Sequence, residues 1–167
     1  MRISTQRLLL REAEDSDISS LSAYHMDRRY LEHYTTTPDA AEVIAKAKSW
    51  AMESPRLNYQ LVITCSGEPR AIGCGGVRGR GYPDWEAEIG IELNPSCWGV
   101  GYASEAVLAL VEFSQSIGIA VLHAITACTN VRAHRLFLNA GFRLLESGRP
   151  TGRSEFRRYV EERTDLE

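Results

Sequence analysis

The chain has 167 residues, of which 44% are hydrophobic and 25% are charged, and its formal net charge is −3. This length suits a single folded domain over residues 1–167, and the apolar share excludes a disordered chain. The slight negative charge argues against a nucleic-acid partner, because general nucleic-acid binding needs a basic face. With no signal-peptide pattern and no apolar run that could cross a membrane, we expect a cytoplasmic protein without a membrane partner.

The spacing of apolar residues and of helix-capping residues predicts an α/β chain. The expected strands cover about residues 3–11, 59–65, 71–77, 86–93, 120–128, 142–146 and 154–160. The expected helices carry Ile18 to Tyr24 after a cap at Asp15 or Ser16, Ala40 to Met52 after Asp39, residues 102–117, and the segment from Asn130 to Gly141.

The four cysteines are not arranged as a metal site. None of them has C-x-x-C spacing, and no histidine lies at zinc-finger spacing. We therefore expect reduced, mostly buried thiols and no bound metal. They are Cys65, Cys74, Cys97 and Cys128.

The segment from Asn94 to Ala106 is the most informative part of the chain. It links an expected strand to an expected helix through two glycines, Gly99 and Gly101. The first amides of a helix have no partners within the helix, and together with the helix dipole they form an anion site. Glycine lets the backbone approach such an anion closely. The segment therefore predicts a ligand that carries phosphate.

Two familiar phosphate loops do not fit this segment. A Walker A loop needs Lys and then Ser or Thr after its last glycine, but Tyr102 and Ala103 follow Gly101. A dinucleotide-binding loop needs a third glycine where Ser104 stands. The glycine-rich run of residues 73–79 also fails that pattern, and we interpret it as the end of a strand with a bulge or turn.

The remaining pattern, Trp98-x-x-Gly101-x-Ala103, resembles the [Q/R]-x-x-G-x-[G/A] loop of the GNAT acyl-CoA acyltransferases. The longer form W-G-x-G-Y-A-x-E-A is similar to the RimJ/RimL-type branch of ribosomal-protein N-acetyltransferases, although Trp98 departs from the general Gln or Arg. Three further motifs resemble this branch in the same order along the chain. They are T-x-R-L-x-L-R at residues 5–11, E-I-G at residues 88–90, and N-x-x-A followed by G-F at residues 130–142.

The resemblance implies a mixed, mostly antiparallel sheet with splayed middle strands and flanking helices. It implies acetyl-CoA as co-substrate and no metal. The backbone of Ile91, Glu92 and Leu93 would align the pantetheine arm and polarise the thioester, and Asn130 would bond the same arm besides capping its helix. The pyrophosphate loop would consist of Trp98, Gly99, Val100, Gly101, Tyr102 and Ala103, with Trp98 either contacting the ligand or packing under the loop.

Glu88 is the candidate general base, because an amine must lose a proton as it attacks a thioester. Glu86 and Glu92 would share its strand face, so either could be the base instead, and each could also be an ordinary exposed carboxylate. The general acid is missing from its usual positions, which hold Ala133 and Phe137. The thiol could leave as a thiolate or take a proton from water, and His134 is more simply interpreted as a helix residue than as the acid.

The acceptor pocket would lie between the first two helices, around His25, Tyr30, His33 and Tyr34, although these residues could equally serve ordinary packing. Together these features predict an N-acetyltransferase acting on a small-molecule amine or a protein N-terminus by direct attack in a ternary complex. The alternative from another class is a non-catalytic acyl-CoA-binding sensor or interaction domain. The chain would act as a monomer or a homodimer.

Overall fold

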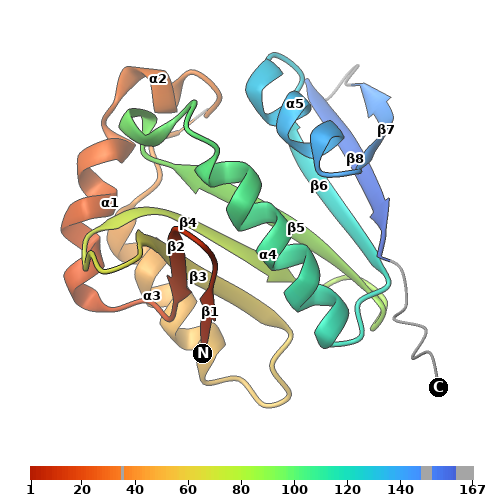
Figure 1. The fold of residues 1–167 in the computed structure, drawn as a ribbon, viewed down its shortest axis with the longest axis horizontal. Helices are drawn as coiled ribbons and strands as arrows, with labels where there is room; N and C mark the ends of the chain where they lie inside the picture. Colours follow the sequence, from red (N-terminus) through yellow and green to blue (C-terminus); the bar gives the residue numbers. More distant parts are fainter. Residues whose placement is uncertain (35, 148–151, 161–167) are drawn as a thin grey trace.

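A computed structural model of the chain describes residues 1–34, 36–147 and 152–160. Within these residues, eight strands form one sheet in the order β1-β2-β3-β4-β5-β6-β8-β7 (Figure 1). The β5–β6 pair is parallel and the other neighbouring pairs are antiparallel, so the mixed, mostly antiparallel sheet expected from the sequence is confirmed. The strands are β1 Arg2–Ser4, β2 Leu8–Arg11, β3 Asn58–Cys65, β4 Ala71–Arg78, β5 Glu86–Leu93, β6 Val121–Ala127, β7 Arg143–Ser147 and β8 Arg153–Tyr159.

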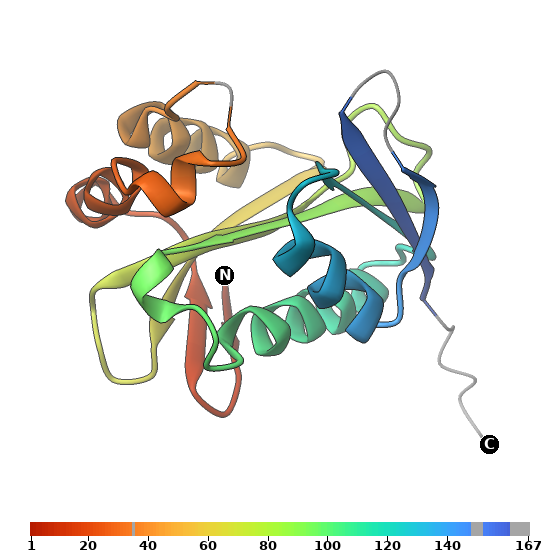
Figure 2. The ribbon, with the colours of Figure 1, turned by 90° about the horizontal axis from the view of Figure 1, so that it is seen from above.

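Helices cover both faces of the sheet. Figure 2 shows α1, α2 and α3 on one face and α4 and α5 on the other. Among the residues described, no helix is both long and apolar enough to span a membrane. The helices are α1 Ile18–His25, α2 Arg28–Leu31, α3 Ala40–Ala51, α4 Tyr102–Ser116 and α5 Val131–Asn139.

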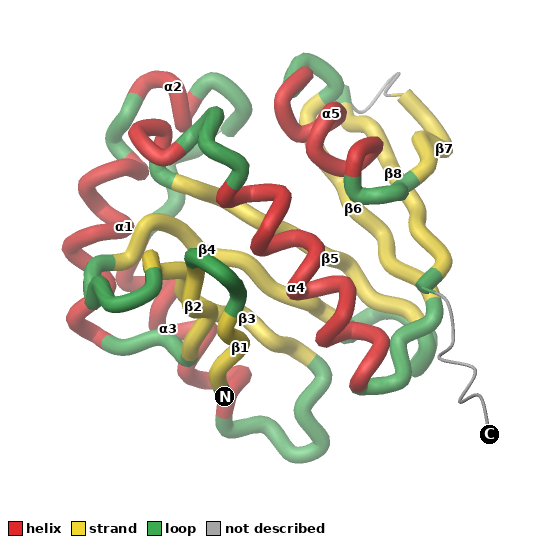
Figure 3. The backbone as a smooth tube through the Cα atoms, viewed as in Figure 1, coloured by secondary structure: helices red, strands yellow, loops and turns green. Residues whose placement is uncertain are grey.

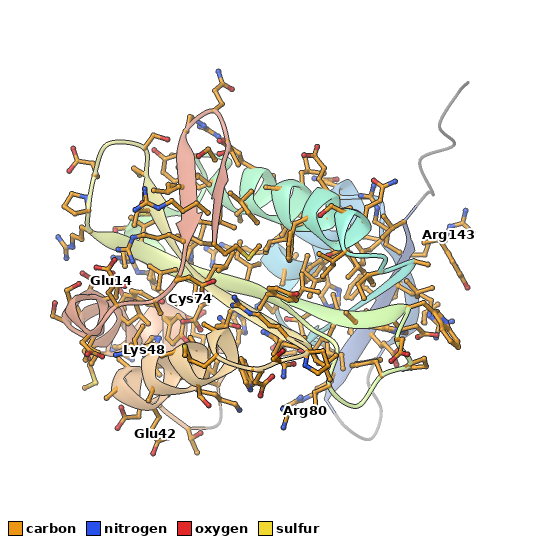
Figure 4. The ribbon with its side chains drawn as sticks, turned by 90° about the horizontal axis from the view of Figure 1, so that it is seen from below. Glu14, Glu42, Lys48, Cys74, Arg80 and Arg143 are labelled. Atoms are coloured by element: carbon orange, nitrogen blue, oxygen red, sulfur yellow. The ribbon has the colours of Figure 1, made fainter. Side chains whose placement is uncertain are left out.

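Two apolar clusters hold these layers together. The larger lies between the sheet and α4, where Leu8, Ile89 and Leu110 are fully or almost fully buried. The smaller joins α1 and α3 to the other face of the sheet and includes Cys74 of β4, which Figure 4 shows on that side. Burial of these side chains stabilises the layers by the hydrophobic effect, at roughly 25 cal/mol per Å² of apolar surface.

The parallel strands β5 and β6 diverge along their length. Their pairing covers only Glu86↔Val121, Ala87↔Leu122 and Glu88↔His123. β5 then continues to Leu93 and β6 to Ala127 along separate paths, as the tube in Figure 3 also shows. The expected splay of the middle strands is therefore confirmed, and it leaves the edge of β5 beyond Glu88 without strand pairing to β6.

The expected single first strand over residues 3–11 is wrong, because the chain turns between β1 and β2. The Thr5 amide donates to the carbonyl oxygen of Leu8 at 2.9 Å, and the Thr5 hydroxyl accepts from the Leu8 amide at 3.0 Å. A threonine that bonds the backbone three residues ahead favours a turn over a continued strand.

The glycine-rich run forms the later part of β4, which ends at Arg78. Ile63 pairs with Gly73 and Thr64 with Ala71, so the extra residue of this register shift lies on β4 beside Gly73, and the expected strand end with a bulge is confirmed. A Cβ at Gly73 would collide with the carbonyl oxygen of Glu92, and one at Gly76 with that of Tyr59. These glycines therefore allow close approach of neighbouring strands.

Candidate active site

The loop after β5 has the predicted strand–glycine loop–helix form. Asn94 accepts a hydrogen bond from the Ser96 amide at 3.0 Å and begins a short turn at Pro95–Cys97. Gly99 and Gly101 follow with φ angles of 81° and 89°, a conformation that side chains disfavour. Gly101 is the N-cap of α4. The first amides of α4 are therefore placed as an anion site.

Thr5 and Arg7 of the β1–β2 turn, distant in sequence, hold this loop through hydrogen bonds to Glu105 and Val100, a set of contacts called the clamp below. One carboxylate oxygen of Glu105, in the first turn of α4, accepts from the Thr5 hydroxyl at 2.5 Å and from the Arg7 amide at 2.7 Å. The Arg7 guanidinium bonds the other oxygen at 2.7 Å and the Val100 carbonyl at 2.9 Å. Burial opposes ionisation of Glu105, but these bonds outweigh it and lower its pKa. Sequence reasoning missed this clamp.

A pocket of about 390 Å³ lies beside the loop, a volume suited to a small-molecule ligand. It brings together eight of the expected cofactor-binding residues. They are Ile91, Glu92, Leu93, Trp98, Gly99, Tyr102, Ala103 and Asn130. Val100 and Gly101 belong to the loop without lining this pocket.

Trp98 lines this pocket and fixes the position of the loop. Its indole N–H donates to the Leu93 carbonyl at 2.9 Å, so it ties the loop to the end of β5. The guanidinium of Arg132 lies 4.8 Å from its ring centroid, a cation–π contact. Arg132 and Arg135 of α5 both line the pocket and supply positive charge beside the loop. Sequence reasoning did not single out Arg132 and Arg135, although their spacing of three residues places both on the same face of one helix.

A second pocket, of about 730 Å³, adjoins the first. Its walls include Gln60, Arg78 and Glu88. The two pockets share a set of lining residues at the place where β5 and β6 diverge. These shared residues are His33, Tyr34, Ile91, Glu92, Asn130, Ala133 and Leu136.

Glu88 lines only the second pocket, where it pairs with Arg78. One guanidinium nitrogen of Arg78 lies 2.5 Å from Glu88 Oε1, and another donates to Gln60 at 3.0 Å. Arg78 packs against the backbone at Gly90, and a Cβ at Gly90 would collide with it. The Glu88 side chain is 30% exposed and therefore accessible from the pocket.

The three candidate carboxylates of β5 have different surroundings. Glu86 lies 2.6 Å from His123 Nε2 and lines neither pocket. Glu92 lines both pockets and is bonded by residues of α1 and of the segment that follows it. Its oxygen Oε1 lies 2.8 Å from the Tyr24 hydroxyl and 3.0 Å from His25 Nε2. The predicted shared face therefore brings only Glu88 and Glu92 to the pockets.

The expected acceptor residues are partly placed at the pockets. Tyr30 lines the first, and His33 and Tyr34 line both. His25 is buried behind them against Glu92 and lines neither. His134 also lines neither, and its ring packs edge-on against Phe156 at 5.1 Å.

Cysteine burial differs from the expectation in one respect. Cys74 is buried and Cys65 and Cys97 are half-buried, but Cys128 is exposed, because it follows β6 at the surface. Cys97 lines the first pocket. In the described part of the chain, no three His, Cys, Asp or Glu side chains are grouped so as to hold a metal ion.

Comparison with known proteins identifies the family of this chain. The family model for the acetyltransferase (GNAT) domain matches residues 7–143. The uncharacterized N-acetyltransferase p20 of Bacillus licheniformis is 29% identical over 114 residues, which cover 65% of this chain. The match spans 63% of that relative, less than two thirds of its length.

Solved structures share the fold at low identity. RimL, a ribosomal L7/L12 α-N-protein acetyltransferase in complex with coenzyme A, has a TM-score of 0.78 at 16% identity, with 96% of this chain and 98% of RimL covered. Spermidine N-acetyltransferase from Vibrio cholerae, in complex with CoA and spermine, has a TM-score of 0.76 at 16% identity, with 93% and 97% covered. Because the family model covers most of the chain, the expected family is confirmed: the chain belongs to the acetyltransferase (GNAT) family.

Proposed function

We propose that this protein transfers an acetyl group from acetyl-CoA to a primary amine by direct attack in a ternary complex. The observation that carries the proposal is the pair of adjoining pockets at the divergence of β5 and β6. The first pocket would hold the cofactor and the second the acceptor. Their shared walls would bring the thioester and the amine together, which provides the proximity that catalysis needs.

The cofactor would bind to backbone groups. The amides of residues 99–103 at the start of α4 would hold the pyrophosphate, with Arg132 and Arg135 adding positive charge. Pantetheine contains amide groups, so it could occupy the open edge of β5 at Ile91 to Leu93 as a substitute strand. Asn130 would bond the same arm from its position in both pockets. The CoA bound in the RimL and spermidine N-acetyltransferase structures supports this choice of cofactor.

The chemistry would proceed by attack of the amine nitrogen on the thioester carbonyl carbon. A new C–N bond forms, and a β5 backbone N–H stabilises the oxyanion. Glu88 would accept the amine proton, directly or through water, since one of its oxygens pairs with Arg78 and the side chain remains accessible. The C–S bond then breaks and CoA leaves as a thiolate, which is a good leaving group because an ordinary thiol has a pKa of about 8.5.

The acceptor would be a small-molecule amine or a protein N-terminus. Both classes occur among the structural neighbours, in spermidine N-acetyltransferase and in RimL. His33 and Tyr34 would form the entrance of the acceptor side.

Titration calorimetry with acetyl-CoA, followed by an assay of thiol release with a panel of amines, tests this function. Saturable binding and steady thiol release support it, whereas no acetyl-CoA binding at millimolar ligand contradicts it. Glu88→Gln should abolish most turnover while retaining acetyl-CoA affinity, and Glu86→Gln on the same strand is its matched control.

A non-catalytic acyl-CoA sensor is the second candidate. It is favoured by Ala133 and Phe137, which stand without hydroxyls at the positions where this family often has one. Tight acetyl-CoA binding without thiol release for any amine would support the sensor and contradict the enzyme.

A further inference from the structure

The carboxylate of Glu92 is enclosed by hydrogen-bond donors from one side of the acceptor pocket. The Tyr24 hydroxyl and His25 Nε2 contact its Oε1 at 2.8 Å and 3.0 Å. The Tyr30 and Tyr34 hydroxyls donate to its Oε2 at 2.6 Å and 3.3 Å. A carboxylate offers about four acceptor positions, so this set fills them.

This arrangement keeps Glu92 ionised and makes it a poor proton acceptor. Burial opposes ionisation, but the hydrogen bonds from His25, Tyr30 and Tyr24 outweigh it and hold the pKa of Glu92 below its ordinary value. Burial and the neighbouring Glu92 charge raise the pKa values of the three tyrosines, so they remain protonated donors. Glu92 is therefore better suited to binding a positive charge than to removing a proton.

One of the four contacts is open to exchange. The Tyr34 bond is the longest of the set, and Tyr34 is 43% exposed, whereas Tyr24 and Tyr30 are almost fully buried. The Tyr34 ring stacks on Tyr30 at 4.6 Å and lines both pockets. A ligand group entering from either pocket could replace the Tyr34 hydroxyl on Glu92 and lie against the same ring.

Among the residues that the structure describes, the only basic partner of Glu92 is His25, whose Nε2 lies 3.0 Å from Oε1 and whose Nδ1 lies 3.2 Å from the Pro38 carbonyl oxygen, so the two form an ion pair when the imidazole is protonated. The other hydrogen-bond partners of Glu92 there are three tyrosines, and none is lysine or arginine. By contrast, Glu88 on the same strand face already pairs with Arg78. Only His25 among these partners can carry a positive charge, so exchange of the neutral Tyr34 hydroxyl for an ammonium ion would give this partly buried carboxylate a permanently charged partner.

The position of Glu92 also suits an acceptor that reacts beside β5. Glu88 and Glu92 flank Gly90, each about 7 Å from it at roughly 3.3 Å per residue. The two carboxylates are therefore about 13 Å apart along the strand, so an ammonium ion held at Glu92 would pass its proton to Glu88 through water. Ile91, Ala133 and Leu136 line both pockets nearby and could cover an apolar tail.

We propose that Glu92 and the ring of Tyr34 form the subsite that receives the acceptor primary amine as an ammonium ion. This ion loses one proton to Glu88 through water before the neutral amine attacks, and the second proton, released as the C–N bond forms, goes to the departing thiolate or to water. This inference rests on the proposed function, because it assigns the acceptor side of the same site. A neutral acceptor would lose the charge-assisted part of the carboxylate contact together with the cation–π contact, and an anionic acceptor would be repelled by the carboxylate.

The test uses n-butylammonium as probe and 1-butanol as its neutral isostere, titrated by NMR into the CoA-loaded protein. The wild-type protein should bind butylammonium at millimolar concentration, at least roughly tenfold more tightly than butanol, since a charged hydrogen bond contributes about this much. Glu92→Gln should lose that preference and Glu86→Gln should keep it. Equal binding of the two probes by the wild-type protein, or unchanged butylammonium binding by Glu92→Gln, would overturn the subsite.

Two further variants decide the matter if Glu92→Gln does not fold. Tyr34→Phe removes a competing donor but keeps the ring, so it should bind butylammonium at least as tightly as the wild-type protein. Tyr34→Leu removes the ring and should bind it several-fold more weakly, and equal binding by both variants would overturn the proposal. Acetyl-CoA binding to the wild-type protein is measured separately, because it tests the proposed function and not the subsite. If the wild-type protein does not bind acetyl-CoA, the proposed function is refuted even if butylammonium binds.

Discussion

Gly101 is the position where the phosphate-loop interpretation can be tested most directly. Its φ of 89° and ψ of 0° place it in the left-handed region at the N-cap of α4. Replacing it with alanine should cost about 1–2 kcal/mol for the backbone conformation. A Cβ there would lie 3.2 Å from a guanidinium nitrogen of Arg7, a flexible side chain that can shift. Most of the cost is therefore backbone strain.

This strain should appear as weaker cofactor binding. If Gly101→Ala moves the loop out of its binding conformation, acetyl-CoA affinity should fall roughly 5- to 30-fold, the equivalent of 1–2 kcal/mol. Gly101→Asn should lose less, because asparagine tolerates this conformation, and Gly101→Val should lose most. Titration calorimetry gives the dissociation constants, and thermal unfolding gives the stability of each variant.

Gly118 provides the matched control at the other end of α4. It has a φ of 85°, and a Cβ there would meet nothing within 4 Å. Gly118→Ala should lower thermal stability to a similar degree but leave acetyl-CoA affinity unchanged. If both variants lose stability and neither loses acetyl-CoA affinity, the loop is not the phosphate site.

Two further predictions concern the ion pairs of the site. Arg7→Met should weaken acetyl-CoA binding several-fold in calorimetry, because the contacts of Arg7 with Glu105 and Val100 that hold the loop are lost. Arg7→Lys should retain part of the acetyl-CoA affinity that Arg7→Met loses. Unchanged affinity in Arg7→Met would show that these contacts do not hold the loop for binding. Glu92 has a lowered folded pKa, so its stabilisation is fully present above its ordinary pKa of about 4.5 and is lost as pH falls through the lower folded value. Urea unfolding should therefore show Glu92→Gln about 2 kcal/mol less stable than the wild-type protein near pH 7, and this gap should narrow as the pH falls below about 4.5. A gap that stays constant would show that the ionised form of Glu92 is not what stabilises the fold.

Local signals made the loop and its helix predictable. The glycines, the N-cap at Asn130 and the stop at Gly118 act within one or two turns of chain, and β5, α4 and α5 fall close to their expected bounds. The side chain of Asn130 accepts from the Ala133 amide at 3.1 Å, which is the predicted cap.

Contacts between distant segments could not be predicted in this way. Thr5 and Glu105 are 100 residues apart, and their bond became visible only when β1–β2 and α4 were placed side by side. Likewise, strand alternation predicted that Glu88 and Glu92 share a face, but it carried no information on their partners. Arg78 of β4 and Tyr24 of α1 decide that one carboxylate is ion-paired and the other enclosed by hydroxyls.

The absence of hydroxyls at residues 133 and 137 leads to a prediction about the leaving group. Ala133 lies in the first turn of α5 and lines both pockets, so Ala133→Ser would place a hydroxyl where the thiolate should form. Phe137 is 4% exposed and packs against Phe142 and Phe156 at ring distances of 5.2 Å and 5.8 Å, so Phe137→Tyr would strain the core.

If the thiol leaves as a thiolate, a new acid can help only below the thiol pKa of about 8.5. Ala133→Ser should then raise kcat near pH 7 by no more than roughly tenfold, a small gain for general acid catalysis, because the leaving group is already good. The gain should vanish above about pH 9, where the thiolate needs no proton. A pH profile of thiol release for both proteins measures this, and a gain that persists at high pH would mean that the hydroxyl acts on the oxyanion or the cofactor position instead.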